Sequence, residues 1–125
     1  MNLRDPLKIA RGLGSAKNGT GHWWTQRLTA VALLLLTPWF LWLVLGLIDA
    51  DHYSVRMTLA RPLNATLLLA YLLAMFWHAQ LGLQVVIEDY VHGWIEMFLQ
   101  VLVKFAYAIG AIACVAALAR IVFSA

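Results

Sequence analysis

Charged residues and cysteines are both scarce in this sequence. Only 12% of its 125 residues are Asp, Glu, Lys or Arg, whereas a soluble domain has about 25%. The single cysteine, Cys114, excludes an intrachain disulfide and a cysteine cluster for zinc or iron–sulfur binding. It lies in an apolar run, and we interpret it as a small apolar filler.

Hydrophobic residues, in contrast, make up 63% of the chain. A chain this short cannot hide so much apolar surface from water, and almost nothing remains outside the apolar runs to build a soluble catalytic domain. Three runs are long enough to cross a bilayer, which takes about 20 residues each. We therefore expect an all-α membrane protein, a single membrane-anchor domain over 1–125. The expected parts are a basic arm at 1–27 and transmembrane helices at about 28–48, 63–87 and 97–123.

Two stretches outside these spans read as loops. The GLGSAKNGTG segment of the arm is rich in Gly and Ser, and no Gly-Lys-Ser/Thr follows that would make it a phosphate-binding loop. The polar connection at 49–61 closes with Arg61-Pro62, and proline suits the first turn of a following helix. Within the first span, Thr37-Pro38 is expected to produce a kink.

The net charge of +3 comes mostly from the first 27 residues. We interpret it as a topology signal and expect no nucleic-acid partner, because no aromatic–basic binding module accompanies it. With the N-terminus in the cytoplasm, that side carries six Lys and Arg residues and the other side three. The six are Arg4, Lys8, Arg11, Lys17, Arg27 and Lys104; the three are Arg56, Arg61 and Arg120. The lipid-embedded chain is thus predicted to have its N-terminus in the cytoplasm.

His78 is the key residue of the second span. Ionisable groups inside a membrane are costly and tend to mark function. Two roles compete: a metal or haem ligand through neutral imidazole, or a proton relay. Asp89 follows eleven residues later, which in a continuous helix is three turns plus about 20°, so both residues share one face.

No other histidine falls in a predicted span: His22 lies in the arm, and His52 and His92 lie in connections. If His78 binds a haem, the second axial ligand must therefore come from a partner helix. The haem would then be shared between two polypeptides, and this chain would be part of a larger assembly.

Four further residues have both a functional and an ordinary interpretation. Gly82, one turn from His78, leaves room for a flat macrocycle or for simple helix packing. Arg27, at the entrance of the first span, is either a snorkelling topology signal or a counter-charge for a haem propionate. Asp89 and Tyr90 are either residue types that are common at a helix end near the membrane–water interface, or they serve a quinone. In the second case Asp89 donates protons and Tyr90 donates a hydrogen bond.

The pattern His78-x3-Gly82-x6-Asp89-Tyr90 resembles the core motif of the hydrophobic membrane-anchor subunit of succinate dehydrogenase, respiratory complex II. This family is also described as the small cytochrome b subunit. The arm adds His22-Trp23-Trp24-x2-Arg27-x-Thr29-Ala30, which is similar to the N-terminal region of bacterial members. The three-span plan matches as well, so the resemblance covers nearly the whole chain.

The resemblance implies a complex with a flavoprotein subunit, an iron–sulfur subunit and a second membrane anchor, the cytochrome b subunit. Electrons from succinate oxidation would reduce ubiquinone at a bacterial inner membrane, or at the matrix side of a mitochondrial one. It further implies that His78 is an axial ligand of haem b iron, that Tyr90 hydrogen-bonds the quinone and that Asp89 supplies protons. Arg27 and Gly82 would contact the haem, and His22 is offset from the family pattern and is left out of the haem contacts.

Two alternatives remain open at this point. The anchor of a quinol:fumarate reductase would run the same reaction in reverse. A small proton-coupled transporter, or its accessory subunit, would use His78 and Asp89 as a relay, although such proteins usually show repeated or interrupted spans and no internal repeat is visible here. In the favoured interpretation the chain is not catalytic alone and belongs to an oxidoreductase complex.

Overall fold

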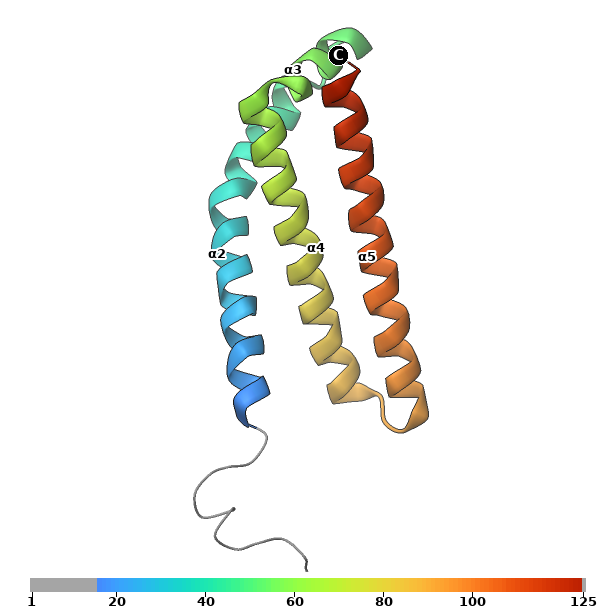
Figure 1. Ribbon diagram of the computed structural model, residues 1–125. Coiled ribbons are helices and arrows are strands. Elements are labelled where there is room, and N and C mark those ends of the chain that lie inside the picture. Colours follow the sequence, from blue (N-terminus) through green and yellow to red (C-terminus); the bar gives the residue numbers. More distant parts are fainter. Residues whose placement is uncertain (1–15, 125) are drawn as a thin grey trace, which may run out of the picture.

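The computed structural model describes residues 16–124, and its regular elements are four helices. They are α2 (Ala16–Gly46), α3 (His52–Ala60), α4 (Pro62–Tyr90) and α5 (Trp94–Phe123). In Figure 1, α4 lies between α2 and α5, and the short α3 lies across one end of the three long helices. Among the described residues α2 and α5 do not approach each other, so the long helices form an open row and not a closed bundle.

Three of the helices are long and apolar enough to span a membrane, as the sequence predicts. These segments are Thr20–Gly46, Pro62–Tyr90 and Trp94–Phe123. Only four hydrophobic side chains of the described residues are buried: Leu43, Leu81, Ile87 and Leu118. The many large apolar side chains on the outside suit contact with lipid or with helices of other subunits.

The two loop predictions are wrong where the structure describes them. Helix α2 already begins at Ala16 and includes Gly19 and Gly21; the earlier part of the predicted arm loop lies outside the described residues. A glycine in a helix costs about 1 kcal/mol relative to alanine. Cooperative extension of the long apolar helix that follows offsets this cost. Helix α2 also continues through Pro38.

The connection predicted as a loop at 49–61 contains helix α3. Its N-cap is Asp51, whose carboxylate accepts a hydrogen bond from the Ser54 backbone N–H at 3.4 Å. Hydrogen bonding from Ser54, chiefly from its side chain and also from its backbone N–H, lowers the pKa of Asp51 below its ordinary value. Arg61 has an extended ψ of 132° that ends α3, as expected before a proline, and Pro62 opens α4 in the first-turn position predicted for it.

The α4–α5 interface is closely packed through small residues. A Cβ added to Gly110 would lie 2.9 Å from the Phe76 ring, so only glycine fits without a shift there. The Phe76 ring also makes an edge-to-face contact with Tyr107, with ring centroids 6.2 Å apart. The chain reaches α5 through Gly93, whose φ of 81° is a conformation that favours glycine.

Candidate functional site

The side chain of His78 lies at the α2–α4 interface. Its Nδ1 is hydrogen-bonded to Thr29 Oγ1 of α2 at 3.0 Å. Thr29 is 8% exposed and is the one buried polar side chain among the described residues, while His78 remains partly exposed. For Nε2 of His78, no hydrogen-bond partner occurs within the described part of the chain. One nitrogen of the ring is therefore fixed by the chain, and the other is available.

Thr29 belongs to a polar face on an otherwise apolar helix. His22, Gln26 and Thr29 are spaced by four and three residues, so they lie on the same side of α2. His22 Nε2 and Gln26 Oε1 are buried, and neither has a hydrogen-bond partner among the described residues. Buried polar atoms normally have partners, so this face can accept a polar group that lies outside the described residues.

The position of His22 differs from the sequence prediction. It was assigned to the arm outside the spans, but it lies in α2 and within the candidate span Thr20–Gly46, because the arm becomes helical earlier than predicted. His22 nevertheless precedes Thr29 by seven residues, about 10 Å along the axis. Because Thr29 contacts His78, the two residues lie at the same level of the molecule. His22 therefore lies about two helical turns from that level.

Gly82 lies one turn after His78 on α4. A Cβ added there would meet nothing closer than the Gln26 side-chain nitrogen, at 3.9 Å. Packing within the chain therefore does not require a glycine at this position, in contrast to Gly110. The space over Gly82 is next to the polar face formed by His22, Gln26 and Thr29.

Arg27 lies on the outside of α2, with its guanidinium carbon 5.3 Å from the centroid of the Trp23 ring. This is cation–π distance. No ion pair between Arg27 and an acidic group occurs within the described residues, so its charge can pair with an anionic group that lies outside them.

Asp89 and Tyr90 are the last two residues of α4, at the end of the row where α2 begins (Figure 1). Helix α4 is continuous from Pro62 to Tyr90, so the rotation that places His78 and Asp89 on one face applies. Both terminal residues are exposed, and the Tyr90 side chain is 82% exposed. The neighbouring Glu88 instead accepts a hydrogen bond from Gln84 at 2.8 Å.

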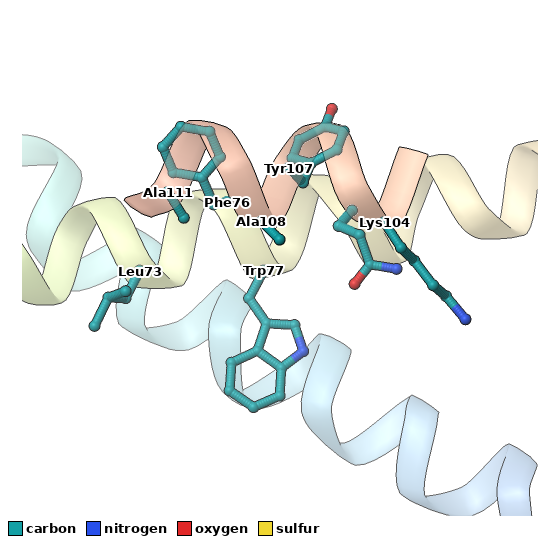
Figure 2. A pocket seen from close by; sticks show the side chains of 8 residues that line it. Leu73, Phe76, Trp77, Lys104, Tyr107, Ala108 and Ala111 are labelled. Atoms are coloured by element: carbon teal, nitrogen blue, oxygen red, sulfur yellow. The ribbon is translucent and has the colours of Figure 1, made fainter. Parts of the chain in front are cut away.

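A cavity of about 350 Å³ lies on the other side of α4, against α5. Figure 2 shows Phe76 and Trp77 of α4 together with Lys104 and Tyr107 of α5 around it. The sequence interpretation had named Lys104 only as a topology signal. Neither His78 nor the Asp89-Tyr90 pair lines this cavity.

The predicted site residues thus occupy two levels of the molecule. His78 and Gly82 lie along the α2–α4 interface, and Asp89 and Tyr90 lie at the end of α4. The polar partners on α2 (Thr29, Gln26 and His22) were not assigned roles from the sequence, although their 4–3 spacing in an apolar helix was a usable signal.

The described residues contain no group of three or more His, Cys, Asp or Glu side chains that could hold a metal ion. A haem makes a smaller demand, because the porphyrin supplies four ligands and the protein adds axial ones such as histidine.

Comparison with known proteins identifies the family of the chain. Residues 1–119 match the family model described as succinate dehydrogenase/fumarate reductase transmembrane subunit. Three relatives illustrate the similarity. The succinate dehydrogenase hydrophobic membrane anchor subunit of Rickettsia bellii is 40% identical over 90 residues, 72% of each chain. The protein of the same name from Paracoccus denitrificans is 35% identical over 93 residues, 74% of this chain and 72% of its own. The succinate dehydrogenase membrane anchor subunit of Reclinomonas americana is 37% identical over 86 residues, 62% of this chain and 67% of its own.

No solved structure matches the chain with significance. The family model covers nearly the whole sequence, and the relatives share more than a third of their aligned residues with it. With three membrane-spanning helices and this extent of similarity, the chain belongs to the family of succinate dehydrogenase/fumarate reductase transmembrane subunits, whose relatives here are membrane anchors of succinate dehydrogenase.

Proposed function

We propose that this chain anchors a succinate dehydrogenase in the membrane, supplies one side of a haem b site and forms part of the ubiquinone site. The observation that carries the proposal is the His78 imidazole fixed against Thr29 between two membrane helices, with its second nitrogen unpartnered among the described residues. That nitrogen would hold the haem iron. Bound there, haem b supplies a one-electron carrier between the succinate-oxidising part of the complex and the quinone.

The chain's own residues fit such a group. His78 would bind iron through neutral imidazole. Gly82 leaves space one helical turn from His78, since a Cβ added to it would lie 3.9 Å from the nearest atom, the Gln26 side-chain nitrogen. Arg27 is exposed, and within the described residues its guanidinium lies over the Trp23 ring without an ion pair, so it could pair with a propionate carboxylate. His22 Nε2 and Gln26 Oε1, which have no hydrogen-bond partner among the described residues, would supply further polar contacts on the same face.

The second axial ligand would come from a partner chain. No other histidine of α2, α4 or α5 is close to His78, since His22 lies two turns away along α2. Large apolar side chains of the open row are exposed among the described residues, and Leu34 and Trp42 are each 73% exposed. We infer that the second membrane anchor, the cytochrome b subunit, packs on this surface. The iron–sulfur and flavoprotein subunits would then dock at the end where Asp89 and Tyr90 lie.

Tyr90 and Asp89 would serve the quinone. The exposed Tyr90 hydroxyl can donate a hydrogen bond to a quinone carbonyl, which polarises it for reduction. Asp89, adjacent to it at the helix end, can pass protons to the reduced oxygen. Neither residue lines the cavity of about 350 Å³ between α4 and α5, and we infer that partner subunits complete the quinone pocket. The start of α2 lies at the same end (Figure 1), and we assign this end to the cytoplasm, or to the matrix in a mitochondrion.

The direction of the reaction follows the relatives. The family description includes fumarate reductase, but the curated relatives cited here are named as succinate dehydrogenase anchors. We therefore propose succinate oxidation with quinone reduction. No such relative favours the transporter considered as an alternative.

A reduced-minus-oxidised absorption spectrum of the purified complex tests the haem assignment. The chain is co-expressed with its partner subunits, and we expect b-type bands whose intensity corresponds to one haem per copy of this chain. A complex that assembles fully and shows no b-type bands would contradict the proposal for His78.

The quinone assignment has a separate test. Tyr90→Phe removes one hydroxyl and little volume, so assembly and haem content should be retained. Quinone reduction should fall about tenfold or more, the effect expected when a hydrogen bond worth about 1.5 kcal/mol to the reacting group is lost. Electron transfer from succinate to an artificial acceptor that bypasses the quinone serves as the control. Normal quinone reduction by the variant would mean that Tyr90 is not a contact.

A further inference from the structure

The Thr29 hydroxyl has three close neighbours but only one proton. Its oxygen lies 2.8 Å from the Thr25 carbonyl oxygen, 3.0 Å from the Gln26 carbonyl oxygen and 3.0 Å from Nδ1 of His78. A hydroxyl donates one hydrogen bond and accepts through two lone pairs. A carbonyl oxygen only accepts. The position of the hydroxyl proton therefore decides the position of the imidazole proton.

Two arrangements exist for a neutral ring. In the first, the hydroxyl proton points at Nδ1, and Oγ1 then faces two carbonyl oxygens at 2.8 Å and 3.0 Å with no proton between them. Such oxygen pairs at hydrogen-bond distance repel. In the second, the hydroxyl donates to the carbonyls in a shared bond and accepts from Nδ1–H of His78. Only the second arrangement satisfies all three contacts.

We propose that Thr29 is a positioning residue that holds His78 in the Nδ1–H tautomer and so leaves the Nε2 lone pair for the iron. This inference rests on the function proposed above for His78. Metal-binding histidines generally donate their second ring N–H to a fixed acceptor, which sets the tautomer and ring orientation and raises the basicity of the ligand. Thr29 provides that acceptor from the neighbouring helix.

The burial of Thr29 makes the interaction persistent. The residue is only 8% exposed, so water has little access to compete for the imidazole N–H. Its hydroxyl is held by its own helix, because the shared bond to Thr25 and Gln26 fixes the direction of the accepting lone pairs. The contact also joins residues 49 positions apart, and so it aligns α2 against α4 at the level of the ligand.

Thr25 provides a matched control one turn earlier on α2. Its hydroxyl makes the same kind of bond, to the Gly21 carbonyl at 2.9 Å, but it has no hydrogen bond to His78. Thr25→Val therefore removes a helix back-bond without touching the imidazole. Thr29→Val, nearly equal in shape to threonine, removes both the back-bond and the acceptor. Thr29→Ser keeps the hydroxyl and should restore whatever the valine variant loses.

The first readout does not depend on haem. Full-length chain labelled with ¹⁵N-histidine is placed in lipid bilayers, and the ¹⁵N chemical shifts of His78 report which ring nitrogen carries the proton. Wild type, Thr25→Val and Thr29→Ser should show Nδ1–H. Thr29→Val should show a mixture of tautomers or Nε2–H. An unchanged tautomer in Thr29→Val would overturn the inference, as would equal changes in Thr25→Val and Thr29→Val.

The second readout uses the assembled complex. Loss of a partner to a metal-binding histidine weakens metal binding by about 10- to 100-fold, so Thr29→Val should hold haem less tightly than the Thr25→Val control. The less basic ligand should also move the haem reduction potential to a more positive value. If Thr29→Val prevents assembly, Thr29→Ala removes the hydroxyl with less bulk and takes its place.

The two proposals fail in different ways. A wild-type complex without haem would overturn the ligand role of His78 and the consequence drawn for Nε2, whatever the tautomer. A wild-type complex with haem, combined with a Thr29→Val variant that has the same potential and haem retention, would overturn the inference and leave the proposed function intact.

Discussion

Helix α4 presents two unlike faces to its neighbours. Toward α2 it places His78, which makes a polar contact with Thr29 beside the uncrowded Gly82. Toward α5 it places Phe76, which packs against Gly110 and Tyr107. Phe76 and His78 are two residues apart, so their side chains diverge by about 200° around the axis. A single helix thus separates a face suited to chemistry from a face suited to tight packing.

The difference shows how a small membrane protein combines function with stability. An apolar side chain gains little from leaving lipid, so membrane helices associate through close van der Waals packing and scattered hydrogen bonds. The α4–α5 face uses the first of these, with a ring inserted over a glycine. The α2–α4 face uses the second, and its packing leaves two buried polar atoms without a partner in the described residues.

Substituting alanine for one residue on each face of α4 should affect haem binding in one variant and stability in the other. His78→Ala should abolish haem binding in the assembled complex, because it removes the proposed ligand, and assembly with the partner anchor should weaken with it. Phe76→Ala should retain haem but unfold more easily, by about 0.5–3 kcal/mol, because packing contacts with Gly110 and Tyr107 are lost. Haem content from the difference spectrum and thermal unfolding followed by circular dichroism separate the two effects. Equal haem loss in both variants would contradict the conclusion that the two faces of α4 have different roles.

The two glycines of the interfaces provide a matched pair. Glycine to alanine in a helix gains about 1 kcal/mol from propensity at either position. At Gly82 the added methyl meets only an atom 3.9 Å away, whereas at Gly110 it would lie 2.9 Å from the Phe76 ring. We expect Gly110→Ala to be less stable than Gly82→Ala by about 1–3 kcal/mol, the usual cost of overpacking. Denaturant titration of both variants in detergent measures the difference.

The same pair also sharpens the functional side of the comparison. If a haem covers Gly82, Gly82→Ala should lower haem occupancy while leaving the stability of the chain unchanged or slightly raised. Gly110→Ala should show the reverse, with reduced stability and normal haem occupancy. Haem retention that is identical in both variants would show that nothing bound lies over Gly82.

The smallest expected effect concerns α3, outside both interfaces. Hydrogen bonding from the Ser54 side chain, with a smaller contribution from its backbone N–H, lowers the pKa of Asp51, so the ionised carboxylate stabilises the folded helix. That stabilisation is present above the unfolded-state pKa and is lost as pH falls through the folded-state pKa. Asp51→Asn keeps a capping side chain, so it should keep α3 at neutral pH and lose this acid dependence. Amide hydrogen exchange of α3 at several pH values measures it.

Several features of the fold followed from particular residues. The long apolar runs predicted three spans, and Pro62 predicted a helix start, because proline has no N–H to lose there. Helix α3 was not predicted, because a nine-residue polar helix with a single cap has too little periodic signal. The helical start at Ala16 was missed because nearby glycines resemble a loop when the cooperative span that follows is not considered.

The candidate site was predictable in part. His78 stood out because an imidazole inside an apolar run is costly, and the structure places it where it meets another helix. Its roles, and those of Arg27, Gly82, Asp89 and Tyr90, stay predictions. Thr29 was part of the family pattern but had no visible role, because a threonine in a helix usually bonds only its own backbone.

The sequence by itself determined that this chain is a three-span membrane protein, because apolar run length is matched to bilayer thickness without reference to any neighbour. It also determined which residues of α4 share a face, since helical rotation depends only on residue number. Only the tertiary structure decided which helix each face meets. Periodicity orients side chains around one axis, but the pairing of Thr29 with His78 and of Gly110 with Phe76 depends on how separate helices pack together.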